Sequence, residues 1–358
     1  SPTTPAAGPL PGNRPPPRPA MMAQEVSGLA ERDDRMDNLR CALMVLVVFC
    51  HLLVETSAGP LTGALYQIIY VFHMPAFVFV TGYFARWRPE KIARGLLLPY
   101  VEFQLLGIAW RNFAAGRAWY VGLTLLEPAW TLWYLLACAL WSATVPLLSR
   151  ARDDRIRLGV VGIAFLVSMG VGFVPWVGSA LDLSRLIVLY PFFCAGFYAG
   201  QRGLSRRIGA LGPSQLRRLR LISTGAIVVV MVIHYLHGSC PKHTLYRDSA
   251  YGSLWDCEAR VILQTAACAW IAWLLLVMPP RQLPGITRVG RNTLSIYLLH
   301  TWLIRMLRPA LPLPGGEMAH VLASAVLAVA MCEALGSGVV CASFRYVFCG
   351  GWLVRRNG

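Results

Sequence analysis

Charged residues are scarce in this chain. Only 14% of its 358 residues are Asp, Glu, Lys or Arg, whereas 56% are hydrophobic and the mean hydropathy is +0.53. Soluble domains carry about 25% charged residues, so this composition excludes an ordinary soluble enzyme.

Lysine and acidic residues are the scarcest of the charged residues. Lys91 and Lys242 are the only lysines among 33 basic residues, and 17 acidic residues leave a net charge of +16. A strongly basic balance can indicate nucleic-acid binding. No loop here combines a contiguous basic groove with interleaved aromatic residues, so we expect no nucleic-acid partner.

Two catalytic motifs and a targeting segment are also missing. The sequence has no Gly-x-Ser-x-Gly elbow and no Gly-rich loop that would cradle phosphate. Residues 1–36 lack the apolar segment of a secretory signal peptide, and eight of the first 19 residues are proline. We expect residues 1–36 to form a disordered, Pro-rich cytosolic tail.

What the sequence does contain is a series of apolar segments long enough to cross a bilayer, which takes about 17–25 residues. We predict ten spans, of which the sixth and ninth are short. They lie near residues 38–57, 64–85, 95–115, 130–148, 158–175, 185–200, 221–237, 261–278, 292–307 and 319–341. The sequence therefore predicts an all-α polytopic membrane bundle, with a membrane domain at residues 37–344 and a short cytosolic tail at residues 345–358.

The basic residues are unevenly divided between the two sides of this bundle. The N-terminal tail, alternate loops and the C-terminal tail hold 25 of the 33, and the other side holds eight. Short loops rich in Lys and Arg stay in the cytosol. We therefore expect both termini in the cytoplasm and a multi-pass protein of the inner plasma membrane.

Cysteine is present at ten positions, most of them inside apolar spans, where a thiol behaves as a small hydrophobe. Cys240 and Cys257 lie in the predicted outer loop at residues 238–260. An oxidising compartment would allow these two to pair, and we expect a disulfide there, with two free thiols as the alternative.

Three histidines near Cys240 could in principle ligate zinc. They are His234, His237 and His243, each three residues from the next candidate ligand. This spacing is loose and lacks a flanking carboxylate. We expect no metal site.

The first span carries four ionisable residues on one helical face. Arg40 and His51 are 11 residues apart, which places them within about 20° of each other and about 16 Å apart along a helix. Asp37 lies on the same face at the cytosolic mouth, and Glu55 lies one turn beyond His51. Ionisable groups inside a span are costly and usually face a cavity or a partner, so this stripe predicts the wall of a substrate tunnel.

A buried neutral histidine is suited to act as a general base at neutral pH, and a nearby carboxylate can orient it. We therefore predict a catalytic role for His51, assisted by Glu55 and His73. The alternative is a histidine that is hydrogen-bonded across helices only for packing. We expect His300 and Glu102 to bind the acceptor, with structural hydrogen bonds or buried pairs as their alternative.

Several motifs occur in a consistent order along the chain. Arg40, ten residues and then His51 form an Arg-x10-His pattern in the first span. The others are the run Phe72-His73-Met74-Pro75, the basic pair Lys91-Ile-Ala-Arg94, the run Trp130-Thr-Leu-Trp133-Tyr-Leu and the run Ser295-Ile-Tyr297-Leu-Leu-His300. Together they resemble the membrane acyltransferase 3 family, in particular its fucose 4-O-acetylase-like branch.

The resemblance implies an enzyme that takes an acyl group, most often acetyl, from cytosolic acyl-CoA. The group is passed to a hydroxyl of a cell-surface carbohydrate or glycolipid. His51 would be the catalytic histidine, and Arg40, Lys91 and Arg94, with Asp37 beside them, would bind the coenzyme A thioester. Direct transfer and a transient acyl-histidine both remain open.

Two departures from the family pattern bear on the chemistry. The glutamate that many members carry after the Trp-x-Leu motif is replaced here by Tyr134 and Leu135, which excludes a base built around it. A hydrolase-like domain after the tenth span is also missing from this sequence, so we expect transfer to finish within the bundle.

Other function classes remain as alternatives. A secondary transporter or flippase would also have many spans and intramembrane carboxylates, but its two halves should resemble each other, and residues 180–358 show no second Arg-x10-His pattern. A non-catalytic membrane partner is the third interpretation. Membrane lipid is an expected partner in every case, and the sequence leaves the oligomeric state open.

Overall fold

The structure is a computed structural model that describes residues 33–56, 59–114, 127–177, 182–238, 240–248, 250–311 and 315–349. The chain divides into two units after Asp33, and all helices described below belong to the second. The predicted tail at residues 1–36 lies outside the described residues except for its last four. Within the described ranges the regular structure is entirely helical, which confirms the predicted all-α class.

Eight helical segments are long and apolar enough to span a membrane. They are α2 (Asp34–Thr56), α3 (Pro60–Phe84), the continuous segment made of α4 (Pro89–Ile92), η1 (Ala93–Leu97) and α5 (Leu98–Ala114), then α8 (Asp154–Gly170), α9 (Leu183–Gln201), α11 (Pro213–His237), α13 (Leu254–Val277) and α16 (Glu317–Leu335). The predicted polytopic bundle is therefore confirmed.

The remaining helices are shorter. They are α6 (Trp133–Ala143), α7 (Val145–Leu148), α10 (Leu204–Gly209), α12 (Lys242–Tyr246), α14 (Ile286–Arg291), α15 (Thr293–Leu307) and α17 (Gly338–Phe348), with the single-turn helices η3 (Val171–Phe173) and η5 (Arg308–Ala310).

Each of the ten predicted spans coincides with a helix, but several lengths differ from the prediction. The sixth is a full span, because α9 has 19 residues, whereas the fourth is short, because α6 has only 11. The tenth ends at Leu335, where the Ser337 side chain accepts a hydrogen bond from the Val340 amide and caps a separate helix, α17. The predicted tail at residues 345–358 therefore begins inside α17.

The helix starts follow from local sequence. Pro60, Pro89 and Pro213 each stand in the first turn of their helix, where the missing N–H costs nothing and φ is already helical. At the start of α13, the side chain of Asp256 accepts from the Ser253 amide at 3.1 Å. This capping box satisfies a donor that the helix itself leaves unpaired.

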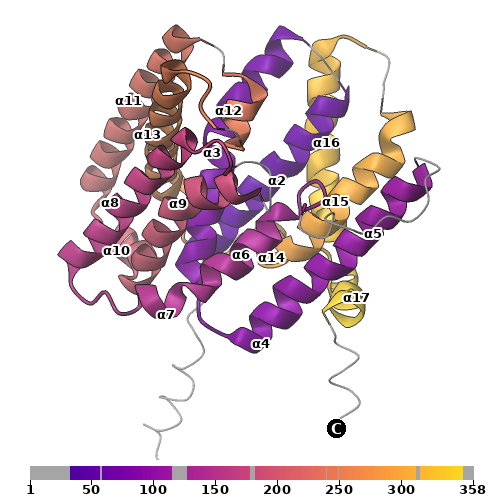
Figure 1. Cartoon of the computed structure of the whole chain (residues 1–358), viewed down its shortest axis with the longest axis horizontal. Coiled ribbons are helices and arrows are strands. Elements are labelled where there is room, and N and C mark those ends of the chain that lie inside the picture. Colours follow the sequence, from indigo (N-terminus) through magenta and orange to yellow (C-terminus); the bar gives the residue numbers. More distant parts are fainter. Residues whose placement is uncertain are drawn as a thin grey trace, which may run out of the picture. The chain divides into compact units, whose positions relative to one another are not determined.

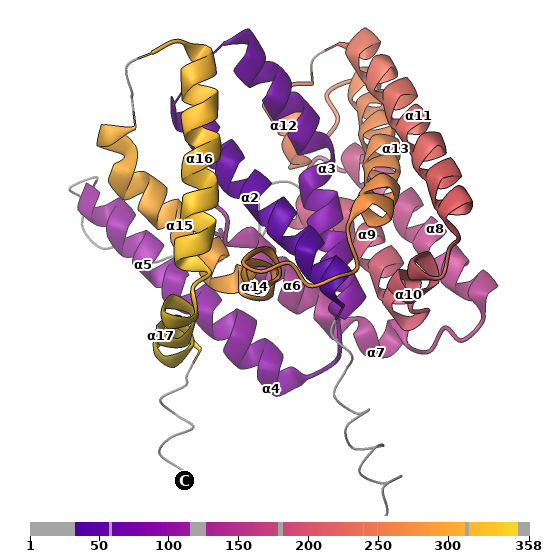
Figure 2. The same ribbon diagram turned by 180° about the vertical axis from the view of Figure 1, so that it is seen from behind.

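The helices form a central group with a peripheral layer around it. Of the residues in the most apolar 18-residue stretch of α2, 67% are buried inside the bundle. The buried share is 61% for the same stretch of α3 and of α9, but only 11% for that of α11. α11 and α8 lie at one edge of the bundle (Figures 1 and 2), and α16 lies on the face turned toward the viewer in Figure 2. Large apolar side chains such as Leu221, Val228 and Leu236 are exposed on α11, as expected for helices that contact lipid.

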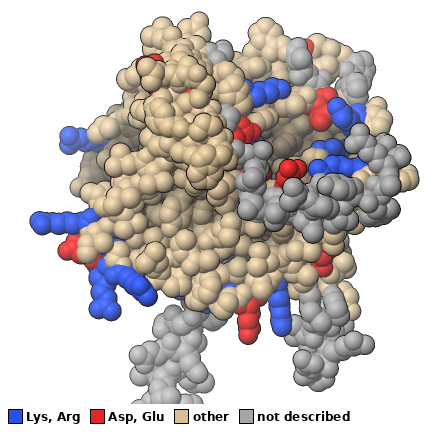
Figure 3. All heavy atoms as spheres, viewed as in Figure 1, with Lys and Arg blue, Asp and Glu red and all other residues tan. Residues whose placement is uncertain are grey.

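The basic loops gather at one end of the bundle. α4, α7, α10 and α17 all lie at the lower end in Figure 1. Figure 3 shows Lys and Arg side chains along the lower left and lower edge of this face, with others higher on its right side. The loops that the charge count placed on one side therefore lie on one side. Their orientation toward the cytosol remains a prediction.

Cys240 and Cys257 do not pair, so the expected disulfide is wrong. All ten cysteines are free. The buried Cys240 sulfur lies 3.9 Å from Nδ1 of His234 on α11, whereas Cys257 lies on α13 beside Tyr251. The two thiols therefore have different neighbours in the structure.

Glycines on α3 and α9 allow a very close crossing of these two helices. A Cβ atom at Gly82 would lie 2.1 Å from the Phe193 carbonyl oxygen, and one at Gly196 would lie 1.9 Å from the Phe79 carbonyl oxygen. Gly196 and Gly200 have the four-residue spacing of small residues that lets membrane helices approach closely. The absence of side chains at these points sets the distance between the two central helices.

Replacement of Gly196 by Ala should force α3 and α9 apart. Overpacking of a close contact costs about 1–3 kcal/mol, so the midpoint of thermal unfolding in detergent should fall. Gly225→Ala on α11 is the matched control, because no atom lies within 4 Å of a Cβ there. Equal midpoints for the two variants would show that the crossing does not depend on Gly196.

Candidate active site

A cavity of about 260 Å³ lies where the central helices meet α6, α12 and α15. Its polar lining consists mainly of His51, His73, Arg185, Arg247 and Arg305, and its aromatic lining consists of Tyr70, Trp130, Trp133, Tyr246 and Tyr297. Ligand sites are typically concave, with apolar walls and a few convergent polar groups. This cavity fits that description.

A larger hollow of about 730 Å³ lies elsewhere, between α6, α7, α8 and α9. Its lining is almost wholly apolar and includes Leu147, Ile156, Ile163 and Val167, all exposed on the outer surface of the bundle. It contains no histidine or carboxylate. The groups capable of acid–base chemistry are therefore in the smaller cavity.

Three histidines from three different helices meet at this cavity. His51 comes from α2 and His73 from α3, and both line it. His300, on α15, is fully buried directly behind, with its ring centroid 5.3 Å from that of His51. The sequence predicted roles for all three residues, and the structure brings them together.

Backbone hydrogen bonds fix the tautomers of two of these histidines. Nδ1 of His73 lies 2.8 Å from the Ile69 carbonyl oxygen, and Nδ1 of His300 lies 2.9 Å from that of Ile296. A carbonyl only accepts, so Nδ1 carries the proton in both rings and Nε2 keeps its lone pair. Nε2 of His300 is buried without a hydrogen-bond partner.

The predicted stripe on the first span is real, because α2 is one unbroken helix from Asp34 to Thr56. Glu55, however, does not line the cavity. Its Oε2 lies 2.9 Å from Nε of Arg308, beyond the end of α15. One helical turn carries the carboxylate past His51, so His300, and not Glu55, is the neighbour of the His51 ring.

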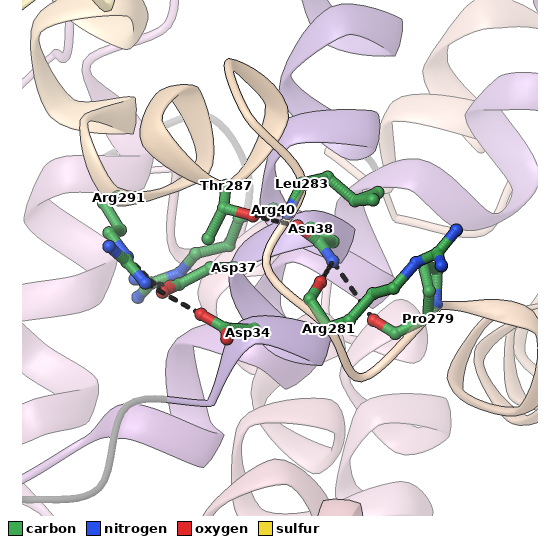
Figure 4. Close-up of polar contacts among 9 residues, drawn as sticks. All are labelled: Asp34, Asp37, Asn38, Arg40, Pro279, Arg281, Leu283, Thr287 and Arg291. Carbon is green, nitrogen blue, oxygen red and sulfur yellow. Dashed lines mark hydrogen bonds and ion pairs between the residues drawn. The ribbon is translucent and has the colours of Figure 1, made fainter.

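The N-terminal end of α2 is held by a cluster of ion pairs (Figure 4). Nε of Arg291 lies 3.0 Å from the Asp37 carboxylate, and its Nη2 lies 2.7 Å from that of Asp34. Nη1 of Arg40 is 3.9 Å from Asp37. Asp37 therefore ties α14 to α2 and orients Arg40. The predicted place of Asp37 beside the cofactor stays a prediction, and in the structure its contacts are with these two arginines.

Asn38 fastens the same end of α2 to the chain before α14 (Figure 4). Its Nδ2 donates to the carbonyl oxygens of Pro279 and Arg281 at 3.1 and 2.9 Å, and its Oδ1 accepts from Thr287 Oγ1 at 2.6 Å. A Cβ at Gly290 would lie 1.8 Å from the Asp37 carbonyl oxygen. α14 is therefore packed directly against the α2 backbone.

The cations predicted to bind the cofactor are arranged at this end. The Arg40 guanidinium lies 4.3 Å from the centroid of the Phe84 ring, at the C-terminus of α3. Lys91 and Arg94 follow in α4 and η1, are exposed, and form no ion pair with the described residues. The three cations are thus available at one end of the bundle.

Glu102 does not lie in the cavity, so its predicted role in acceptor binding is not supported by its position. It lies on α5, and its electrostatic neighbour Cys349 follows the end of α17. Its Oε2 is buried without a hydrogen-bond partner. Glu333, another carboxylate of the predicted spans, pairs with Arg288 of α14.

Three arginines that line the cavity belong to none of the motifs found in the sequence. Arg185 lies 2.6 Å from Asp248 and 3.1 Å from Asp182, and its Nε donates to the Tyr246 carbonyl oxygen. Arg305 stacks 3.7 Å from the centroid of the Trp130 ring. Arg247, at the end of α12, is only 2% exposed.

Backbone strain is concentrated around the cavity. Trp130, Asp182 and Arg247 are the non-glycine residues with positive φ among the described positions, at 53°, 50° and 60°. Two of them line the cavity, and the third holds Arg185, which also lines it. Such conformations cost about 1–3 kcal/mol and tend to occur at functional sites.

The arrangement combines a base with cations in one cavity lined by aromatic and polar side chains. A histidine with a free lone pair can accept a proton from a hydroxyl, and nearby donors can stabilise an oxyanion. These are the requirements of acyl transfer from a thioester.

Comparison with known families supports this chemistry. Residues 33–336, more than four fifths of the chain, match the acyltransferase domain of the acyltransferase 3 family. No curated protein and no solved structure matches the chain significantly. The match ends just before α17 and includes every helix that lines the cavity. The chain therefore belongs to the acyltransferase 3 family, and its membrane bundle is an acyltransferase domain.

Proposed function

We propose that this protein is a membrane O-acyltransferase that moves an acyl group, in particular acetyl, from cytosolic acyl-CoA to a hydroxyl of a cell-surface carbohydrate or glycolipid. The observation that carries the proposal is the contact of His51 with the buried His300 in the cavity of a family-matched domain. The inner plasma membrane is the proposed location, in keeping with the charge asymmetry of the loops.

His51 is proposed as the general base, and His300 as the residue that positions it. Nε2 of His300 has a free lone pair and no hydrogen-bond partner in the structure. In the proposed mechanism it accepts a hydrogen bond from one ring nitrogen of His51 once the substrates are bound. The other nitrogen of His51 then has its lone pair directed at the cavity. It takes the proton of the acceptor hydroxyl as the oxygen attacks the thioester carbonyl carbon. The C–O bond forms, the C–S bond breaks, and protonated His51 returns the proton to the leaving thiolate.

The donor is proposed to reach the cavity from the N-terminal end of α2. Arg40 lies about 16 Å from His51 along the helix, and its guanidinium is pre-oriented by Phe84 and Asp37. Arginine binds phosphate with directed hydrogen bonds, and the exposed Lys91 and Arg94 add positive charge. These residues fit the phosphates of coenzyme A, which supplies the activated acyl thioester.

The acceptor is proposed to be a carbohydrate, as in the fucose 4-O-acetylase-like branch that the motifs resemble. The tryptophan and tyrosine side chains of the cavity support this assignment, because they offer flat apolar faces with polar edges. Tyr297 donates to the Thr131 carbonyl oxygen, and Tyr134 is hydrogen-bonded to Thr81. The first bond joins α15 to the start of α6, and the second joins α6 to α3.

His51→Ala should abolish acyl transfer while the protein still inserts in the membrane. Loss of a general base costs about 10²–10⁴-fold in rate. The measurement is ester-linked label formed from labelled acetyl-CoA and glycolipid extracts by membranes that contain the full chain. His243→Ala, a change at an exposed histidine of α12, is the control and should keep wild-type activity. Unchanged transfer by a well-expressed His51→Ala variant would sink the mechanism.

His300 should be replaceable only by a residue that accepts a hydrogen bond. His300→Phe keeps a ring without the acceptor, and loss of one such bond should lower kcat by about tenfold with little change in the KM for acetyl-CoA. His300→Gln restores an acceptor and should recover part of the rate. If the Phe variant is as active as the wild type, His300 only fills space.

A further inference from the structure

The cavity has an unbalanced positive charge on the side of His51 that is remote from Arg40. Arg185, Arg247 and Arg305 line it, and no carboxylate does. Arg185 is neutralised by Asp182 and Asp248. Arg247 and Arg305 form no ion pair with any described residue, so these two set the charge that a ligand would meet.

Arg247 is held in place at the point where the continuous helix α3 lacks one backbone hydrogen bond. Pro75 has no N–H, so the Val71 carbonyl oxygen loses its helical partner. Nη2 of Arg247 donates to that oxygen at 3.0 Å, and Nη1 donates to the Leu245 carbonyl oxygen at 3.0 Å. The guanidinium is therefore fixed beside the cavity by neutral acceptors.

These contacts leave Arg247 without a counter-charge. Its Nε is buried and has no hydrogen-bond partner. Arg260, itself buried, is close enough to repel it. A buried cation without a carboxylate is costly, and an anion in the cavity would remove that cost.

Arg305 offers the second cation. It stacks flat on Trp130, which leaves the edge of the guanidinium available for hydrogen bonds. Glu55 on α2 attracts Arg305 electrostatically, but its ion pair is formed with Arg308. Because Glu55 lies beyond His51 on α2, this pair marks the end of the helix opposite to Arg40. Arg305 therefore lies away from the proposed coenzyme A side.

We propose that the acceptor carries an acid group, a carboxylate or a phosphate, which Arg247 and Arg305 bind so that a hydroxyl of the same molecule meets His51. The identification of this anion as part of the acceptor rests on the proposed function. The anion site itself is defined by the geometry of the two arginines.

Binding of small probes tests the site without catalysis. The full chain in lipid nanodiscs is titrated with glucuronate, glucose 1-phosphate and glucose, and each Kd is obtained by ligand-observed NMR. At least one anion should bind about tenfold more tightly than glucose, as expected for charge-assisted hydrogen bonds. The ratio of the two anions then shows whether the site prefers a carboxylate or a phosphate.

Substitutions show which residues cause the preference for an anionic sugar over glucose. Arg305→Gln changes a half-buried side chain that is not needed for the α3 contact, and should remove most of the preference while glucose binding stays unchanged. Arg247→Gln should do the same if it folds. Arg111→Gln, an exposed change on α5 outside the cavity, is the control and should keep the preference.

Equal affinity for all three probes, no binding of either anion, or a preference that survives Arg305→Gln would overturn the proposal. These outcomes concern binding only, so they would leave the result of the acyl-transfer assay unchanged. Conversely, an anion preference without any acyl transfer would reject the proposed function and leave the anion site in place.

Discussion

Polar groups inside a membrane bundle must find their partners within the protein, because the hydrocarbon region offers no water. The central part of this structure follows from that constraint. Pro75 frees the Val71 carbonyl, to which Arg247 then donates. On α9, Trp141 and Gln264 donate to the carbonyls of Leu186 and Val188, in the turn before Pro191. Side chains from other elements thus bind backbone carbonyls near both prolines.

The same constraint explains the state of the histidines. His73 and His300 each donate from Nδ1 to the carbonyl one turn earlier, which is the only acceptor always within reach of a helical histidine. In these two neutral rings Nε2 can therefore only accept a hydrogen bond. The structure shows no such backbone bond for His51, so one of its ring nitrogens can donate to one partner while the other accepts from a second. The difference between the three rings therefore arises from local backbone geometry.

Much of the fold could be predicted from the sequence, because span length, hydropathy and basic loops are local properties. The common face of Arg40 and His51 was predictable for the same reason, since both lie on one helix. The partners of these residues were not. Glu55 shares the face of His51, yet its side chain reaches Arg308, which lies 253 positions further along the chain.

The cavity arginines illustrate the other limit of sequence reasoning. Arg247 lies in a loop that hydropathy places outside the membrane. Only its contact with the Val71 carbonyl of α3 in the folded protein brings it to the site. Pro75 is the one sequence signal that could have suggested a side-chain partner there. Glu102 shows the opposite error, because an ionisable residue within a span was expected at the site and lies near α17 instead.

The glycine crossing of α3 and α9 also fixes one side of the cavity. Two helices whose backbones touch cannot slide or tilt without a steric clash, and α2 is fastened to α14 through Asn38. These three walls of the cavity therefore behave as a fixed frame. The remaining walls are shorter elements, namely the five-residue α12, the start of α6 and the 15-residue α15. The cavity is thus built in two ways, with backbone contacts on one side and side-chain contacts between short helices on the other.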